Sequence, residues 1–255
     1  MTVNDLKVAQ HISQSQIKTF ILCPQKYRFQ YRDKIPVPFV PSSLVFGSAM
    51  HGAIADFYQM YLEGERITKE VLSSSFSDYW KAEEEVNEIR YSGEDRDSLF
   101  KMADKLLEVF IQKAQPRNVV AIEQPFKVEI EGLPALVGVI DLLEEDASGS
   151  VVIVDHKCAA RRKSDFELST DLQMSAYAIG IKALGYEQEP LLRFDMFLKS
   201  KNPDYVKQFT TRSDYDKERF INLVRAVWTA IQKDVFYPIE SYMCDGCQFK
   251  EYCRK

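Results

Sequence analysis

Two apolar runs decide the fold of this chain, and both end in charged residues: Ala135-Leu136-Val137-Gly138-Val139-Ile140-Asp141 and Val151-Val152-Ile153-Val154-Asp155-His156-Lys157. The segment between them closes with Asp146-Ala147-Ser148-Gly149-Ser150, which is typical of a turn. The pattern predicts a hairpin that brings the two charged strand ends to one point.

The residue types at this point indicate phosphodiester chemistry. Asp141 and Asp155 supply the hard oxygen ligands that Mg²⁺ or Mn²⁺ prefers. Asp155 and Lys157 are two residues apart on a strand, so their side chains share one face. The ammonium group of Lys157 can steady an attacking water or the charge that develops on the phosphate. The alternative left open by these three residues alone is a solvated surface ion pair.

The length, composition and net charge of the chain limit the classes of protein to which it can belong. The chain has 255 residues, is 45% hydrophobic and 28% charged, and carries a formal net charge of -5. These values indicate a globular protein, and they argue against one that coats DNA indiscriminately. A local basic groove is compatible with them. No apolar run is long enough to span a membrane, and the N-terminus lacks a signal or transit pattern, so we expect a cytoplasmic, intracellular protein.

The periodicity predicts an α/β fold with a helical lobe, a core and a tail. We expect a helix over 13–32 that restarts at Pro24, because proline cannot sit deep inside a helix. The remaining predicted elements are three helices over 44–114, strands 119–130, 133–143 and 151–157, a helix 170–184 capped by Thr170, strands 191–198 and 206–211, and a helix 213–235. The lobe is residues 1–117, the core 118–237 and the tail 238–255, with no flexible linker between them.

His51 lies on a predicted helix that is poor in bulky residues: Gly47-Ser48-Ala49-Met50-His51-Gly52-Ala53. Small residues let a helix approach another backbone or a substrate closely. A neutral imidazole there could bind Mg²⁺ or Mn²⁺ beside the carboxylates, although a lone histidine is more often a packing residue.

Further polar residues follow the second apolar run. Gln173 and Tyr177 are four residues apart and share one helix face, where they could bind a phosphate or stack on a base. The alternative is that Tyr177 belongs to the core. Arg161 and Arg162, followed by Lys163, form a local basic patch that could follow a DNA backbone, or they could form a solvated loop.

Four of the five cysteines have the spacing of a metal site. Cys244 and Cys247 form a CxxC pair, Cys253 follows, and Cys23 with Pro24 lies far upstream. Four thiolates can hold either zinc or an iron–sulfur cluster, and zinc is the default for a CxxC pair. Cys158 is left over, and we expect it to be a small, buried, apolar residue.

The segments Ile140-Asp141 and Asp155-His156-Lys157 together resemble the PD-(D/E)xK nuclease superfamily. The His51 motif and Gln173-Met174-Ser175-Ala176-Tyr177 resemble motifs of RecB-like nucleases. The cysteine pattern resembles the iron–sulfur staple of AddB-type and CRISPR-associated RecB-like exonucleases. The chain departs from the superfamily name at Ile140, where proline is expected, and has aspartate rather than glutamate at Asp155.

This resemblance implies a single RecB-like nuclease domain with a restriction-endonuclease-like core, which is a mixed sheet flanked by helices. It implies that the backbone carbonyl of His156 binds the metal and that Glu123 binds a second ion or an outer-shell water. An ordinary edge-strand glutamate is the alternative for Glu123. For Cys23, Cys244, Cys247 and Cys253 it implies a [4Fe–4S] cluster that ties the two ends of the chain together.

The sequence therefore predicts a Mg²⁺- or Mn²⁺-dependent deoxyribonuclease, an exonuclease that acts on single-stranded DNA or DNA with free ends. The resemblance implies products with a 5′-phosphate, and it is compatible with a helicase or CRISPR adaptation proteins as partners and with phage or mobile-element DNA processing. The chain has no G-x-x-x-x-G-K-[ST] motif, so a partner would have to unwind DNA. Two alternatives remain: a nucleic-acid-binding or assembly subunit organised by the cluster, and a zinc-stabilised structural protein.

Overall fold

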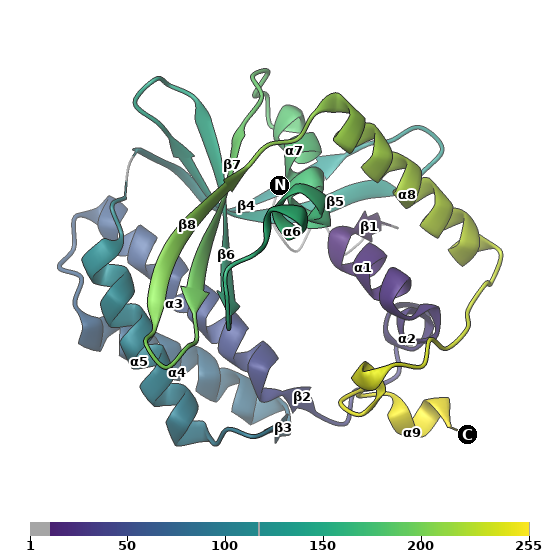
Figure 1. Cartoon of the computed structure of the whole chain (residues 1–255), viewed down its shortest axis with the longest axis horizontal. Helices are drawn as coiled ribbons and strands as arrows, with labels where there is room; N and C mark the ends of the chain where they lie inside the picture. The colour runs from purple at the N-terminus through teal and green to yellow at the C-terminus, as the bar shows by residue number, and fades with distance from the viewer. Residues whose placement is uncertain (1–10, 117, 255) are drawn as a thin grey trace.

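The structure is a computed structural model that describes residues 11–116 and 118–254. Its centre is a mixed six-stranded sheet with helices on both faces, which confirms the predicted α/β class (Figure 1). The strands are β1 (His11–Ser13), β4 (Asn118–Val128), β5 (Ala135–Glu145), β6 (Val151–Ala159), β7 (Leu191–Leu198) and β8 (Asp204–Thr210). A separate parallel pair joins β2 (Val40–Pro41) to β3 (Ile89–Arg90).

The sheet divides along β5. One edge of β5 pairs with antiparallel β4 over nearly its whole length. The other edge pairs first with parallel β1, from Ala135 to Val137, and then with antiparallel β6, from Leu142 to Glu145. Strand β6 leaves β5 after Val154 and continues beside parallel β7 as far as Ala159. Strands β5 and β6 therefore form a fork, and polar side chains can enter the sheet where the strands part.

Two sets of helices cover the two faces of the sheet. One set is α3 (Ser42–Glu63), α4 (Lys69–Val86) and α5 (Arg96–Lys113), seen at the lower left of Figure 1. The other is α1 (Gln14–Leu22), α7 (Leu172–Ala183) and α8 (Asp214–Gln232). The short elements are α2 (Pro24–Tyr27), the π-helix η2 (Arg28–Arg32), α6 (Asp165–Thr170), η3 (Tyr242–Cys244) and α9 (Lys250–Cys253).

The side chains of β6 point alternately to the two faces of the sheet, so both faces acquire an apolar core. Ile153 packs into the apolar cluster under α1, α7 and α8. Its neighbours Val152 and Val154 pack into the cluster with α3, α4 and α5. A strand buried on both faces reads as a continuous apolar run, as 151–154 does. The same alternation places Asp155 and His156 on opposite faces of the sheet.

Side-chain caps fix where most of the helices begin. Ser13, Thr68, Asp95, Asp171 and Ser213 each accept a backbone N–H at the N-terminus of a helix, which satisfies a donor that the helix leaves free. Helix α3 ends at Gly64, whose φ of 70° is left-handed and suits glycine.

Four details of the predicted elements are wrong. Helix α7 is capped by Asp171 rather than Thr170, because Thr170 ends a separate short helix, α6. Strand β1 was missed, since a three-residue strand has no local pattern. Helix α8 ends at Gln232 rather than near Val235. Asp141 and Asp155 lie within their strands, not at the ends, because β5 runs on to Glu145 and β6 to Ala159.

Among the described residues, no helix is both long and apolar enough to cross a membrane.

Candidate active site

The fork between β5 and β6 brings Asp141 and Asp155 together. The backbone N–H of His156 donates to Oδ2 of Asp141 over 2.8 Å, which bridges the gap where the two strands part. Asp155 is 0% exposed, and the ammonium nitrogen of Lys157 lies 3.0 Å from its carboxylate. The predicted placement of Asp155 and Lys157 on one strand face is therefore what the structure has.

Three side chains at the fork could hold a metal ion. Ligand atoms of His51, Glu123 and Asp141 all lie within 4.8 Å of one another, and they are the one such group of three or more among the described residues. His51 contributes Nδ1, which is 3.4 Å from Oδ2 of Asp141. One nitrogen and several carboxylate oxygens suit a divalent cation such as Mn²⁺ or Mg²⁺.

Glu123 enters this group through an unusual backbone. Its φ is 49°, in the left-handed region that residues with a side chain rarely adopt. Strand β4 pairs with β5 on both sides of it, at Ile122 with Leu142 and at Gln124 with Ile140, which places Glu123 opposite Asp141. Such a conformation costs on the order of 1–3 kcal/mol. Lys34 and Asp234, which lie outside this group, adopt it as well, so the site role of Glu123 stays a prediction.

The electrostatics of the fork favour a bound cation. Burial, followed by the charge of Asp141, raises the pKa of Glu123 to about 7. Burial also raises the pKa of Asp155 to about 6, although Lys157 opposes the shift. Burial alone would lower the pKa of Lys157, but the carboxylates of Asp155 and Asp141 raise it. One ammonium therefore faces three carboxylates, and a divalent ion would neutralise the excess.

Both nearby histidines are held neutral. Burial and the charge of Lys157 lower the pKa of His51, so its imidazole is free to bind a metal. Burial lowers the pKa of His156 far more. The His156 ring lies on the sheet face opposite Asp155, with its centroid 5.9 Å from that of Tyr58 and 6.3 Å from that of Phe197. This is also the side of His51: the centroids of the two histidine rings are 6.1 Å apart, and Nδ1 of His156 lies 3.7 Å from Oδ2 of Asp141. The His156 side chain therefore borders the site as well as packing, and the metal contact of its carbonyl stays a prediction.

Tyr177 lies under the site and not on a DNA-binding surface. Its side chain is 3% exposed, and its hydroxyl donates to the carbonyl of Val139 over 2.7 Å. The hydroxyl oxygen lies 3.4 Å from Oδ1 of Asp155 and accepts from the amide of Gln173 over 2.6 Å. A base cannot stack on a ring this deeply buried, so the stacking role expected of Tyr177 is corrected. Tyr177 and Gln173 instead hold β5 and Asp155 in position from helix α7.

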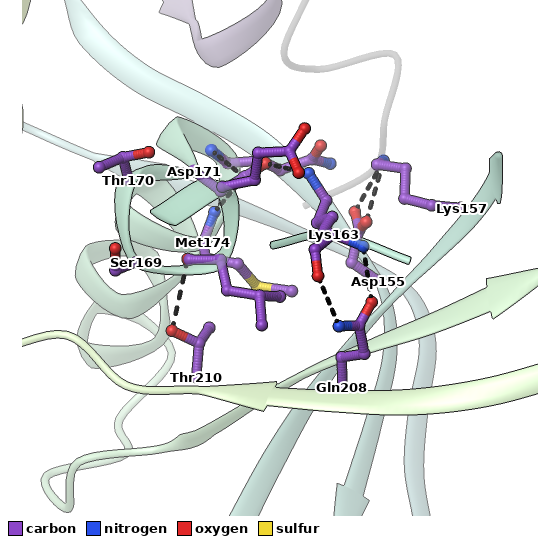
Figure 2. A network of polar contacts seen from close by, with 12 residues as sticks. Asp155, Lys157, Lys163, Ser169, Thr170, Asp171, Met174, Gln208 and Thr210 are labelled. Carbon is purple, nitrogen blue, oxygen red and sulfur yellow. Dashed lines mark hydrogen bonds and ion pairs between the residues drawn. The ribbon is translucent and has the colours of Figure 1, made fainter. Parts of the chain in front are cut away.

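The basic patch leads away from the fork along the loop after β6. Arg161, Arg162 and Lys163 line one surface pocket together with Lys157. Arg161 is exposed and donates twice to Glu167, over 2.8 and 2.9 Å. Lys163 is held by Asp171, whose carboxylate lies 2.9 Å from its ammonium nitrogen, as Figure 2 shows beside the Lys157–Asp155 pair. The basic patch is therefore anchored to the fold through Lys163, whose side chain is paired with Asp171.

Asp171 connects this loop to the helix behind the site, and sequence reasoning missed it. One of its oxygens caps α7 at Gln173 and Met174, and the other binds Lys163. On the far side of the loop, the side chain of Gln208 accepts from the backbone N–H of Lys163 and donates to its carbonyl (Figure 2). The Ser-Thr-Asp sequence before an apolar run was the available signal for the cap.

A buried ionic network behind the site was also missed. Arg193 donates to Glu144 over 2.6 Å and twice to Asp195, over 2.7 and 3.1 Å. The hydroxyl of Tyr205 also donates to Oδ2 of Asp195, the oxygen that accepts the longer of the two bonds from Arg193. Burial works against the charge of Arg193, but the two carboxylates outweigh it and raise its pKa. The signal was an Arg and an Asp two residues apart in an otherwise apolar strand, which places both on one buried face.

The four predicted cluster cysteines surround one pocket of about 300 Å³ between the two ends of the described chain. The thiol pKa of Cys253 is raised by burial and then by Cys23, Cys247 and Cys244, so all four are near neighbours. Cys158 lies apart from them. Burial raises its pKa to about 12, as expected of a packed thiol.

Comparison with known proteins identifies a family that the chain matches and solved structures that resemble it. A family model described as the PD-(D/E)XK nuclease superfamily matches residues 11–254. A crystal structure from Eubacterium rectale, described as a "putative exonuclease", aligns with a TM-score of 0.61 and 15% identity, over 100% of this chain and 92% of that one. The structure of SSO0001 aligns over 94% of each chain, with a TM-score of 0.40 and 10% identity. No curated protein matches the chain.

Proposed function

Because the chain belongs to the PD-(D/E)XK nuclease superfamily, we propose that it is a divalent-metal-dependent DNA nuclease of the RecB-like type. The observation that carries the proposal is the group at the fork. Ligand atoms of His51, Glu123 and Asp141 lie within 4.8 Å of one another, next to the buried Asp155–Lys157 pair. This group could hold a divalent metal, with a lysine beside it, on the restriction-endonuclease-like fold that the sequence predicted.

The residues at the fork divide the work of phosphodiester hydrolysis. His51, Glu123, Asp141, Asp155 and the carbonyl of His156 would hold Mg²⁺ or Mn²⁺. A bound divalent ion supplies Lewis-acid polarisation of the scissile phosphate and lowers the pKa of an attacking water. Lys157 stays protonated, so its ammonium group orients the water and offsets the negative charge that develops on the phosphate.

Two further residues act as positioning residues. The hydroxyl of Tyr177 ties the backbone at Val139 to helix α7 and sits beside Asp155. Gln173 fixes that hydroxyl from one turn earlier in the helix. Both residues hold the fork in shape, which is the role that fits their burial. Exposed Arg162, together with Arg161 and Lys163, would follow the DNA backbone away from the fork.

We further propose that the enzyme is an exonuclease on DNA with free ends and that Cys23, Cys244, Cys247 and Cys253 hold a [4Fe–4S] cluster. In support, the four cysteines line one pocket. A Cys₄ zinc site is the alternative for the same four residues.

The proposed organisation is one domain: a mainly helical lobe over 1–117, whose strand β1 joins the central sheet, a nuclease core over 118–237, and a staple that joins 238–255 to Cys23. Residues 1–10, 117 and 255 lie outside the part of the chain that the structure describes. Ordered contacts support the staple. The backbone N–H of Gln25 donates to the carbonyl of Tyr237, and the Gln248 side chain donates to the carbonyl of Phe39. Action with a helicase or with CRISPR adaptation proteins stays a prediction of the family resemblance.

Digestion of end-labelled linear and closed circular DNA, with Mg²⁺, Mn²⁺ or EDTA, tests the activity. We expect metal-dependent loss of linear DNA that spares the circle, and loss of activity in Asp141→Ala, Asp155→Ala and Lys157→Ala proteins that remain folded. Asp104→Ala, a carboxylate on the outer helix α5, is the matched control. Metal-independent cleavage, or full cleavage by the Asp155→Ala protein, would contradict the proposal. Binding of DNA without cleavage under every condition would favour the binding-subunit alternative.

A further inference from the structure

Tyr79 stands beside the candidate active site, on a helix to which nothing above assigns a function. It belongs to α4, and its ring lies across Gly52 of α3, the residue after the candidate ligand His51. A Cβ atom at Gly52 would be 2.5 Å from two ring carbons of Tyr79 and 2.7 Å from a third. Only glycine permits this contact without moving the ring.

The ring of Tyr79 is held in place and yet remains accessible. Its hydroxyl donates to Oδ1 of Asp56 over 3.3 Å, and Ser75 donates to the other oxygen of that carboxylate. The residue is still 42% exposed and lines a surface pocket of about 630 Å³ between α3 and α4. An aromatic ring that is fixed on one side and open on the other can stack with a ligand at little cost in conformational entropy.

The charges around the ring determine which part of a nucleic acid it can meet. The pKa of Tyr79 is raised by burial, then by the carboxylate of Asp56, and also by that of Glu123 at the fork. The contact with Gly52, the residue after His51, brings the ring near the candidate metal-ligand group. These carboxylates would repel phosphate oxygens, so an uncharged nucleobase is the part of the substrate that fits against the ring. Base–aromatic stacking is how many proteins hold single strands without reading their sequence.

We propose that Tyr79 is a stacking platform for an unpaired nucleobase next to the phosphate held at the fork, with Gly52 as its floor. This inference rests on the proposed function, because the base must belong to the DNA that the fork would cleave. It gives the helical lobe a direct part in substrate binding. It also predicts that single-stranded ends are held better than blunt duplex ends, since a paired base cannot leave its stack without cost.

Fluorescence anisotropy with single-stranded oligonucleotides tests the proposal, with Ca²⁺ in place of Mg²⁺ to allow binding without cleavage. Tyr79→Ala should weaken binding by about 5- to 150-fold, the range that corresponds to 1–3 kcal/mol per stacked base. Tyr79→Phe should stay close to wild type, because it keeps the ring. Tyr61→Ala is the matched control, since Tyr61 is also 42% exposed.

A second pair of variants tests the floor of the platform. Gly52→Ala should weaken binding because its methyl group displaces the ring. Gly47→Ala, where a Cβ would meet nothing within 4 Å, makes the same change in helix propensity and should bind as wild type does.

Oligonucleotides with a single abasic position complete the test. Removing the base that meets the ring should weaken binding by wild type but not by Tyr79→Ala, which has already lost the contact. Equal sensitivity of the two proteins at every position would overturn the stacking role while leaving the nuclease proposal intact. If wild type neither binds nor cleaves DNA with any metal, both proposals fail together.

Discussion

Replacing Arg193 by methionine should destabilise the protein severely, although Arg193 lies outside the candidate active site. Arg193 is 4% exposed and is the cation between two buried carboxylates, those of Glu144 and Asp195. Methionine has a similar length and no charge, so the variant leaves both carboxylates without their partner. Breaking a buried ion pair in this way costs about 3–5 kcal/mol.

That loss is a large share of the total stability of a domain, which is about 5–15 kcal/mol. For a chain of this size, 1 kcal/mol corresponds to a shift of about 2–4 °C, so the melting temperature should fall by about 6–20 °C. Thermal and urea unfolding followed by circular dichroism would measure both quantities. Adding Glu144→Gln to the variant should recover part of the loss, because it removes one of the two unpaired charges.

The control is Arg161→Met, which breaks a doubly hydrogen-bonded arginine–carboxylate contact of the same kind at the surface, with Glu167. Exposed pairs contribute little, so its unfolding should be hard to distinguish from wild type. If Arg193→Met cost no more than the surface control, the buried network would not stabilise the fold and the reasoning would be refuted.

Four further predictions concern the site and the cysteines. In EDTA, stability should fall as the pH rises from about 4 through the folded pKa values of Asp155, about 6, and Glu123, about 7. Deprotonation of these two carboxyl groups is costlier in the folded state than in the unfolded state. A bound divalent ion would neutralise the charge, so the loss of stability should vanish when Mn²⁺ is added. Thermal scans from pH 4 to 8, with EDTA or with Mn²⁺, would measure both results. Tyr177→Phe should lower the unfolding free energy by about 1–3 kcal/mol and slow cleavage, and it should leave DNA binding in Ca²⁺ unchanged. Weaker binding by this variant would indicate that Tyr177 contacts DNA directly. Cys158 has a pKa of about 12, so in the native protein it should resist alkylation by iodoacetamide at pH 8, as measured by mass spectrometry. Cys23→Ala should remove the iron and the brown colour of anaerobically purified protein. Iron retained in that variant would contradict the staple.

Local patterns were enough to predict the strands and the chemistry at the fork. The apolar run before Asp155 gave the strand, and the two-residue spacing gave the shared face of Asp155 and Lys157. Helix starts followed from their caps, as at Ser13 and Ser213. These features depend on neighbours in sequence, which is why they could be predicted without knowledge of the rest of the chain.

What could not be predicted depends on partners distant in sequence. The fork exists because β5 changes partner from β1 to β6, and no segment taken alone records that change. The left-handed backbone of Glu123 occurs where β4 pairs with β5 on both sides of it, which the local sequence does not record. The burial of Tyr177 and Arg193 depends on packing between segments distant in sequence; the core role of Tyr177 was one of two alternatives, and Arg193 was given no role.

The meeting of Cys23 with Cys244, Cys247 and Cys253 in one pocket has a consequence for biosynthesis. Cys23 is made early in translation, whereas the other three cysteines emerge from the ribosome more than 200 residues later. The lobe and the sheet can form from segments already made, but the pocket cannot close until residues 244–253 are free. A nascent chain that stops before them would leave the N-terminal helices α1 and α2 without these partners. Closure of the pocket therefore marks the point at which residues 23–253 have all been synthesised and folded together.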